Sequence, residues 1–562
     1  MKWRYLCSLG FFIICFLLVT LRLGYWQVVK ASELSQLGQQ QYGKVVQINP
    51  TRGDIQASDG FPLASNMLSY LIFADPKEIA NKSVAASVLS SDLSMDKASV
   101  SAILDFDKFW VPIKDHIDTK DKVIVEKENL PGIGFQDEYT RFYPEASLAA
   151  SLLGFVGKDD VGNDKGYFGL EGYYDRQLRG RSGEALEIHD AMGRPVLSKA
   201  VDNAGAQDGR TLVLHIDRTI QFLVEDKLKA GIQTYGAQSG MVAVMDPKTG
   251  GILAMANFPT FDPRSFSEYD QGLYINPFIT DLYEPGSTFK PLVMSAAIES
   301  NVVKPDTKCT ICSGPVTVGD YMLHTWDDKY FPNTSMIDVI IHSDNTGMVF
   351  VAQKLGLDRM LSFLNAFGIG STTGIDLQGE EAPGLKPKEN WYPIDLATAG
   401  FGQGISVTPI ELLDAFSTIA NNGMRMEPHI VDKIITPDNQ TIIIPPKVLS
   451  KPISEQTAKV MTEILVDAVN KGEASFARLQ GYRIAGKTGT ASIPVNGHYD
   501  PMKTIASFIG FAPADNPKFV MIVILNKPTA SIYGAETAAP IFFSIAKDLM
   551  DYYGISPTSS NN

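Results

Sequence analysis

A serine and a lysine three residues apart are the first residues in this chain that could do chemistry together. Ser287 and Lys290 lie in the stretch 284–299, which predicts a turn entering an amphipathic helix with Ser287 in its first turn. A spacing of three places both side chains on one helix face. A buried lysine with a lowered pKa can take the serine proton and create a nucleophile. Taken alone, the pair also fits an ordinary helix cap, so it indicates catalysis only in company.

Two later motifs supply that company. The stretch His342-Ser343-Asp344-Asn345-Thr346 contains S-x-N, and the stretch 485–490 (Ala-Gly-Lys-Thr-Gly-Thr) contains K-T-G. The second stretch is extended, and its glycines would allow a ligand backbone to approach closely. If its lysine shares a pocket with Lys290, each lysine lowers the pKa of the other, which leaves Lys290 neutral enough to accept a proton. The three motifs together predict a serine acyltransferase site.

Elements that could position these motifs are visible in the second half of the chain. Two apolar runs around a Pro/Gly turn predict a β-hairpin over 241–255. The apolar runs 507–511 and 519–525 predict adjacent antiparallel strands. Helices are predicted at 218–234, within 335–420 and at 454–470. The sequence therefore predicts a sheet built from both ends of this domain, with helices around it.

The first half of the chain carries no catalytic constellation. Residues 31–50 are polar and Gln-rich, as expected of a stalk beside a membrane, and the region 50–203 mixes turn signals with short β-branched stretches and a predicted helix over 146–153. We predict an α+β fold for this region. Asn, Ala, Gly and Asp dominate 202–207, where we place the domain boundary. The tail from Ser556 is rich in Ser and Asn and is expected to fray.

The N-terminus predicts a membrane anchor. From Tyr5 to Leu21 the chain has 17 residues without a charge, between Lys2 and Arg4 on one side and Arg22 on the other. Such a helix is about long enough to span a bilayer. A cleaved signal peptide is the alternative, but no Ala-x-Ala-like site follows, and aromatic residues of the membrane-interface type follow instead. The basic N-terminus predicts a cytoplasmic end and an exported remainder.

Composition narrows the class of partner. The chain has 562 residues, 44% of them hydrophobic and 20% charged, which excludes general disorder. Its net charge of −14 argues against a nucleic-acid partner. Outside the apolar run the cysteines are Cys309 and Cys312, without a second pair or a histidine cluster, so we expect no metal. A local disulfide and two free thiols both remain open for this pair.

The chain resembles the class B penicillin-binding proteins. The resemblance rests on S-x-x-K, S-x-N and K-T-G in this order, and on shorter matches at 52–55, 59–64, 141–144, 154–157, 169–172 and 402–409. It implies an α+β protein whose second domain, similar to serine β-lactamases, is an antiparallel sheet flanked by helices. The implied parts are a cytoplasmic tip and transmembrane anchor at 1–30, a stalk at 31–50, a pedestal of the dimerisation type at 51–205, a transpeptidase domain at 206–555 and a flexible tail at 556–562.

The resemblance also implies a role for each motif residue. Ser287 would form the acyl ester from D-Ala-D-Ala, Lys290 would be its base, and Ser343 would relay a proton to the departing amine. Asn345 would hold the substrate amide, and Lys487 would support Ser343. Lys487 with the threonines of the third motif would bind the terminal carboxylate or a β-lactam, and the binding residues beside Lys487 would be Thr488, Gly489 and Thr490. The backbone N–H groups of Ser287 and Thr490 would form the oxyanion hole.

Several alternatives remain within and outside this family. A D,D-carboxypeptidase shares the first half-reaction, whereas a class A β-lactamase would need a Glu-x-x-Leu-Asn loop, which is missing between Asn345 and Lys487. A β-lactam sensor or a scaffold is the non-enzymatic alternative, and a Ser-His-Asp triad using His342 is the alternative chemistry. Glu284 and Thr488 favour the septal branch over the elongation branch. The resemblance implies no cofactor, and as partners peptidoglycan stem peptides, a SEDS-type glycan polymerase and division proteins in the inner membrane.

Overall fold

The computed structural model describes residues 2–48, 50–188, 201–495 and 498–557, which divide into two compact units. The first unit comprises Met1–Arg52, Asn66–Thr140 and Gly180–Gly209. The second comprises Gly53–Ser65, Arg141–Arg179 and Arg210–Asn562. Three separate stretches of the chain therefore form the second unit. Two of them, 53–65 and 141–179, precede the domain boundary predicted at 202–207. Most of the tail expected to fray, residues 558–562, lies outside the described residues.

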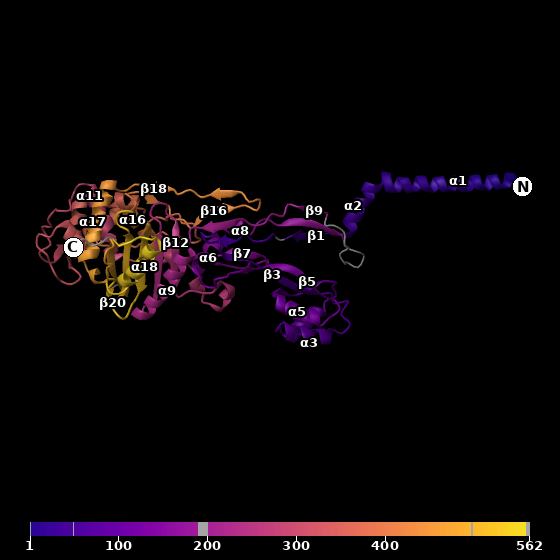
Figure 1. Ribbon diagram of the computed structural model, residues 1–562, viewed down its shortest axis with the longest axis horizontal. Helices are drawn as coiled ribbons and strands as arrows, with labels where there is room; N and C mark the ends of the chain where they lie inside the picture. Colours follow the sequence, from indigo (N-terminus) through magenta and orange to yellow (C-terminus); the bar gives the residue numbers. More distant parts are fainter. Residues whose placement is uncertain (1, 49, 189–200, 496–497, 558–562) are drawn as a thin grey trace. The chain divides into compact units, whose positions relative to one another are not determined.

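The chain begins with one long apolar helix (Figure 1). Helix α1 spans Lys2–Gly24 and continues as a π-helical turn over Tyr25–Val29. These 28 residues are long and apolar enough to cross a membrane, and none of their most apolar window is buried. The Arg22 guanidinium lies 5.8 Å from the ring centre of Tyr25 and 5.1 Å from that of Trp26. Charged and aromatic groups together at the helix end suit a membrane interface.

The predicted stalk has regular structure. Helix α2 spans Ala31–Tyr42, and β1 follows over Gly43–Ile48. β1 pairs antiparallel with β8 (Gly183–Ile188), and β8 pairs antiparallel with β9 (Val201–Ala204). A polar segment can form a strand here because the partner strand comes from about 140 residues later, which local composition does not reveal.

Three helices and three strands form the remaining core of the first unit. The strands are β3 (Pro62–Ala74, in this unit from Asn66 onward), β4 (Val111–Ile117) and β5 (Ile133–Phe142, in this unit up to Thr140), and the helices are α3 (Lys82–Asp92), α4 (Lys97–Leu104) and α5 (Thr119–Lys127). Each helix begins at a side-chain cap, since Asn81, Asp96 and Asp118 accept hydrogen bonds from backbone N–H groups. Leu89 and Val100 are fully buried between helices and strands.

The segments 53–65 and 141–179 contribute short elements to the second unit. These are β2 (Ile55–Gln56), α6 (Ala150–Leu153), β6 (Phe155–Lys158), β7 (Asp164–Tyr167), α7 (Gly169–Tyr173) and α8 (Asp175–Leu178). The helix predicted over 146–153 is wrong in its first half. Ala146 and Ala149 have φ angles of 53° and 55°, in the left-handed region, which interrupts the α-helical hydrogen-bond ladder before Ala150.

A buried arginine joins three of the short sequence matches. Arg141 Nε donates to Glu171 Oε1 at 2.6 Å, and Arg141 Nη1 donates to the Gly53 carbonyl oxygen at 2.8 Å. The Arg141 and Glu171 side chains are 5% and 0% exposed. A buried charge requires a partner and hydrogen bonds, and this pair supplies both. The matches at 52–55, 141–144 and 169–172 therefore have a common structural basis.

A five-stranded antiparallel sheet forms the centre of the second unit. Its order is β12-β11-β21-β20-β19, with β11 at Ser239–Met245, β12 at Ile252–Phe258, β19 at Ala485–Val495, β20 at His498–Ala512 and β21 at Phe519–Asn526. The predicted hairpin and the predicted pair of late strands are both confirmed. β19 is an edge strand, so the K-T-G motif lies on the rim of the sheet.

Helices cover both faces of this sheet. α9 (Arg218–Tyr235) and α18 (Ala538–Tyr552) pack on one face, where Phe508, Phe542 and Phe543 are buried (Figure 1). The predicted helices at 218–234 and 454–470 are confirmed by α9 and α17. Packed in the other layer are α10 (Pro277–Thr280), α11 (Lys290–Glu299), α12 (Met336–Ile341), α13 (Asn345–Leu355), α14 (Leu357–Ala366), α15 (Pro393–Ala399), α16 (Pro409–Ala420) and α17 (Glu455–Lys471).

Short elements connect these helices. The 3₁₀ turns are η2 (Pro263–Glu268), η3 (Gln271–Tyr274), η4 (Gly286–Phe289), η5 (Lys388–Asn390) and η6 (Ser475–Ala477), and the strands are β10 (Thr211–Leu214), β13 (Val316–Val318), β14 (Tyr321–Leu323), β15 (Arg425–Met426), β16 (Val431–Ile435), β17 (Thr441–Ile443) and β18 (Val448–Ser450). β10 pairs in parallel with β2 and antiparallel with β16. This pairing places the early segment 53–65 in the second unit.

Candidate active site

Ser287 lies in a tight turn that feeds directly into a buried helix. The 3₁₀ turn η4 covers Gly286–Phe289, and α11 begins at Lys290. Ser287 is half-buried, whereas Lys290 is fully buried. The predicted amphipathic character of this helix is wrong, because every residue from Lys290 to Ala297 is buried. α11 lies in the middle of the helical layer, so Lys290 at its start is taken out of water, whereas Glu299 at its end is half-buried.

The S-x-N motif reaches both members of the first pair. Ser343 Oγ lies 2.9 Å from Ser287 Oγ. Lys290 Nζ donates to the Ser343 carbonyl oxygen at 2.6 Å, to Asn345 Oδ1 at 2.8 Å and to Ser343 Oγ at 3.2 Å. Within the described part of the chain, Ser287 Oγ and Lys290 Nζ share no direct hydrogen bond. Ser343 therefore connects the two groups that the sequence predicted to act as a pair.

Local backbone geometry sets the position of Ser343. It lies between α12 and α13 with a φ of 55°, a left-handed conformation that an L-residue rarely adopts. Caps flank it on both sides, because Ser335 caps α12 in a capping box with Asp338, and Asp344 caps α13 through the Gly347 N–H. Asn345 begins α13, and its Nδ2 donates to the His324 carbonyl oxygen at 3.0 Å. These caps stabilise the turn that directs Ser343 at Ser287.

The K-T-G motif lies on β19 beside the turn that carries Ser287. A Cβ added to Gly489 would come within 2.8 Å of Thr288 Cγ2 and 2.4 Å of Ser507 Oγ, so only glycine allows this approach. A Cβ added to Gly286 would lie 3.3 Å from the Thr490 carbonyl oxygen. The structure therefore brings all three motifs together.

The K-T-G motif makes hydrogen bonds within itself and with Gly534. Lys487 Nζ donates to Thr488 Oγ1 at 2.9 Å and to the Thr488 carbonyl oxygen at 3.3 Å. Thr490 is half-buried, and its Oγ1 accepts from the Gly534 N–H at 3.0 Å. Among the described hydrogen bonds none joins Lys487 to Ser343, so any support of Ser343 by Lys487 acts through space.

Burial lowers the pKa of both lysines, and Lys290 is also repelled by the charge of Lys487. Removal from water, followed by the charge of Lys487, lowers the pKa of Lys290 to about 7. The carboxylates of Glu473 and Asp344 oppose this shift. Burial also lowers the pKa of Lys487, and Glu473 counteracts it. Near neutral pH, Lys290 can therefore exist as a neutral amine, which is the form that accepts a proton.

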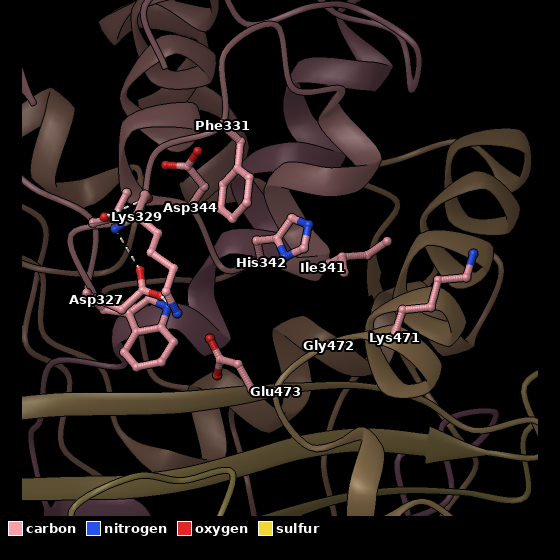
Figure 2. A pocket seen from close by; sticks show the side chains of 11 residues that line it. Asp327, Lys329, Phe331, Ile341, His342, Asp344, Lys471, Gly472 and Glu473 are labelled. Carbon is pink, nitrogen blue, oxygen red and sulfur yellow. Dashed lines mark hydrogen bonds and ion pairs between the residues drawn. The ribbon is translucent and has the colours of Figure 1, made fainter. Parts of the chain in front are cut away.

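A pocket lies beside the motifs, and one of its lining residues, Glu473, has no signal in the sequence. Its volume is about 230 Å³, and His342, Asp344 and Glu473 are among its lining residues (Figure 2). The exposed His342 ring stacks on Phe331, with ring centres 4.5 Å apart, which disfavours the alternative of a Ser-His-Asp triad. Glu473 Oε2 accepts a hydrogen bond from Thr488 Oγ1 at 2.8 Å. No local spacing signals Glu473, since it comes from the loop after α17.

Tyr499, near the start of β20, contacts Glu284 in the segment that leads into Ser287. Tyr499 Oη donates to the Glu284 carboxylate, with 3.1 Å to Oε1 and 3.0 Å to Oε2. Glu284 Oε1 also accepts from the Gly404 N–H at 3.0 Å. Burial raises the pKa of Glu284. Tyr499 therefore contacts the segment that leads into Ser287.

The loop between α11 and α12 contains the two cysteines that lie outside the apolar N-terminal run. Cys309 and Cys312 form a disulfide between two buried side chains. The disulfide lies in the loop between α11 and α12, where the Cys309 N–H donates to the Thr334 carbonyl oxygen at 2.9 Å. Across the described ranges, no group of three or more His, Cys, Asp or Glu residues is arranged to hold a metal ion.

Two regions of the chain match known protein families. Residues 240–551 match the penicillin-binding protein transpeptidase domain, and residues 47–214 match the penicillin-binding protein dimerisation domain. The chain belongs to the class B penicillin-binding proteins. This class B protein is 33% identical to stage V sporulation protein D of Bacillus subtilis, over 99% of this chain and 86% of that protein. It is 29% identical to the peptidoglycan D,D-transpeptidase FtsI of Escherichia coli, over 99% and 93% of the two chains.

Solved structures of penicillin-binding proteins share the fold. A peptidoglycan synthetase from Bifidobacterium adolescentis superposes with a TM-score of 0.75 and 26% identity, over 92% of this chain and 98% of that one. Penicillin-binding protein 3 of Mycobacterium tuberculosis, complexed with aztreonam, gives a TM-score of 0.71 and 27% identity, over 91% and 99% of the chains. The predicted α+β fold, with an antiparallel sheet flanked by helices in its second part, is confirmed.

Proposed function

We propose that this class B penicillin-binding protein is a serine-type D-Ala-D-Ala transpeptidase that cross-links peptidoglycan through an ester on Ser287. Its substrates are stem peptides, and β-lactams acylate the same serine. The observation that carries the proposal is the continuous set of contacts from Ser287 Oγ to Ser343 Oγ and on to Lys290 Nζ, at 2.9 and 3.2 Å. A hydroxyl beside a base of pKa about 7 can be deprotonated at neutral pH.

The donors and acceptors around Lys290 favour a proton path through Ser343. The Ser343 carbonyl and Asn345 Oδ1 can only accept hydrogen bonds, and they are the closer partners of Nζ, at 2.6 and 2.8 Å. A neutral amine gives its two hydrogens to these oxygens, which leaves its lone pair toward the Ser343 hydroxyl. Ser343 can then pass the Ser287 proton to Lys290 as Ser287 attacks the carbonyl carbon of the penultimate D-Ala. The reverse path delivers that proton to the departing D-Ala amine.

The remaining motif residues bind and polarise the substrate. Lys487 and the threonines Thr488 and Thr490 form the site for the terminal carboxylate, and Asn345 holds the substrate amide. The backbone N–H groups of Ser287 and Thr490 stabilise the oxyanion, which in comparable sites contributes about 3 kcal/mol per donor. Gly489 permits the close approach of β19 to the turn at Ser287. An amine of a neighbouring stem then attacks the ester and restores Ser287.

The cellular role we propose is septal wall synthesis in the inner membrane. The relatives FtsI and stage V sporulation protein D support this branch, as do Glu284 and Thr488 in the sequence. The basic residues Lys2 and Arg4 in the first turn of α1 support a cytoplasmic N-terminus, a single-pass anchor and a periplasmic catalytic domain. The proposed partners are a SEDS-type glycan polymerase and other division proteins. A fluorescent fusion should gather at the division site, and uniform side-wall labelling would contradict the septal role.

A cross-linking assay tests the proposed reaction. The full-length protein in detergent would be supplied with glycan strands that carry pentapeptide stems, and the products would be digested and separated by mass. A transpeptidase gives dimeric stems, and these should be absent with Ser287→Ala. If only monomeric, shortened stems formed with the wild-type protein, the carboxypeptidase alternative would hold and the transferase proposal would fail.

A further inference from the structure

Glu473 is a carboxylate that is hydrogen-bonded to the K-T-G motif and takes no part in the reaction steps proposed above. It lies in the loop after α17 and is half-buried. Its Oε2 accepts the hydroxyl hydrogen of Thr488 at 2.8 Å, and Thr488 Oγ1 accepts from Lys487 Nζ at 2.9 Å. Figure 2 shows the Glu473 carboxylate directed into the pocket, whereas the side chain of Lys471 points away from it. Two hydrogen bonds in series thus connect the Glu473 carboxylate, the Thr488 hydroxyl and the Lys487 ammonium.

The direction of this chain is fixed by chemistry. An ammonium can only donate hydrogen bonds, and a carboxylate can only accept them. The single hydroxyl hydrogen of Thr488 is therefore given to Glu473, and an oxygen lone pair of Thr488 receives a hydrogen of Lys487. Thr490 Oγ1 accepts from the Gly534 N–H, and within the described ranges the Thr490 hydroxyl donates no hydrogen bond, so its hydrogen is available to a ligand. Thr490 can therefore donate a hydrogen to a ligand carboxylate, whereas Thr488 gives its hydrogen to Glu473.

We propose that Glu473 is a positioning residue that acts through Thr488 as the counter-charge of the two-lysine site, holding the positive charge on Lys487. This inference rests on the proposed function. Thr488 then serves the ligand by orienting the Lys487 ammonium, and Thr490 supplies the hydroxyl hydrogen. With the positive charge held on Lys487, Lys290 is left to work as the neutral base.

The other charged groups around the pocket are already engaged. Lys329 forms an ion pair with Asp327 at 3.0 Å, and Lys471 forms one with Asp467 at 2.8 Å. Asp344 is buried, caps α13 through Oδ1 and also raises the pKa of Lys290, but among the described residues no hydrogen bond links it to Lys487. The exposed His342 stacks on Phe331 and is the remaining titratable group that lines the pocket. Of the carboxylates lining the described pocket, Glu473 is the one linked to Lys487 by a hydrogen-bonded chain.

The effect on the reaction is a shift along the pH axis. Glu473 raises the pKa of Lys290 and that of Lys487, against the effect of burial. Without this carboxylate both pKa values fall, so the base becomes active at lower pH and the carboxylate-binding ammonium is lost at lower pH. Both limbs of the pH profile of acylation should therefore move in the acid direction.

The test compares Glu473→Gln with the wild-type full-length protein in detergent. Acylation by a fluorescent penicillin would be timed at a series of pH values. For Glu473→Gln, which keeps size and shape, the expected result is an acid shift of both limbs by about half a unit to one unit. Glu473→Asp keeps the charge and should restore the wild-type positions. Glu463→Gln makes the same charge change on α17, at a side chain paired with Arg483, and should leave the profile in place.

Each outcome decides the inference. A merely structural role for Glu473 would lower the rate at every pH without moving the limbs, and that result would overturn the proposal. A shift in the alkaline direction, or an equal shift with Glu463→Gln, would also overturn it. If the wild-type protein were not acylated at all, the proposed function itself would fail, and this failure is distinguishable because it is seen before any Glu473 variant is measured.

Discussion

The lowered pKa of Lys290 predicts how the rate of acylation depends on pH. At pH 7, a lysine whose pKa is about 7 is neutral in about half of the molecules, whereas an ordinary lysine with a pKa near 10.4 is neutral in about one in 2,500. Burial and Lys487 therefore increase the population of the active base about a thousandfold. Because the neutral form accepts the proton, the rate should rise with pH through about 7. At pH 5, about 1% is neutral, so acylation should be about 50-fold slower than at pH 7.

The assay is the rate of labelling by a fluorescent penicillin between pH 5 and pH 8, with the intact protein checked for folding at each pH. Lys290→Arg, whose guanidinium stays charged, should label about 10²–10⁴-fold more slowly at pH 7. Lys487→Met removes a repelling charge, so the midpoint of its residual activity should move to higher pH. A rate that does not change between pH 5 and pH 8, or that falls as pH rises through 7, would refute the role of Lys290 as base.

Two other substitutions test the packing that supports the site. Gly489→Ala places a Cβ 2.4 Å from Ser507 Oγ and 2.8 Å from Thr288 Cγ2, so labelling should fall at least about tenfold, and wild-type labelling would contradict the proposed fit. Arg425→Met leaves the buried Asp414 without its 2.6 Å partner and should reduce the free energy of unfolding by about 3–5 kcal/mol in a denaturant titration. The double variant with Asp414→Asn should recover part of that loss, and a change below about 1 kcal/mol for Arg425→Met alone would contradict it.

The elements that carry the site could be predicted because their signals are local. The hairpin β11–β12 and the strands β20 and β21 are apolar runs bounded by Pro and Gly turns, and α9 and α17 show helical periodicity. The three motifs have fixed internal spacings, so their residues could be named from sequence. Their convergence was a prediction from resemblance, and the contacts of Ser343 with Ser287 and Lys290 agree with it.

The features that could not be predicted depend on partners distant in sequence. Local composition does not reveal that β2 pairs with β10, so the early segment 53–65 was assigned to the region before the boundary. The expected amphipathic pattern of α11 failed because surrounding helices bury it on every side. Glu473 meets Thr488 from a separate loop, at no characteristic spacing. Positive φ angles at Ala146 and Ala149 have no strong sequence signal, since alanine favours helix.

The most direct test of the central claim is to find the residue that a penicillin acylates. The full-length protein would be incubated with a fluorescent penicillin, digested, and analysed by mass spectrometry, with Ser287→Ala treated in parallel. We expect one stable adduct on the peptide that contains Ser287 and none in the variant. An adduct on another residue, or equal labelling of Ser287→Ala, would contradict the assignment of Ser287 as the nucleophile.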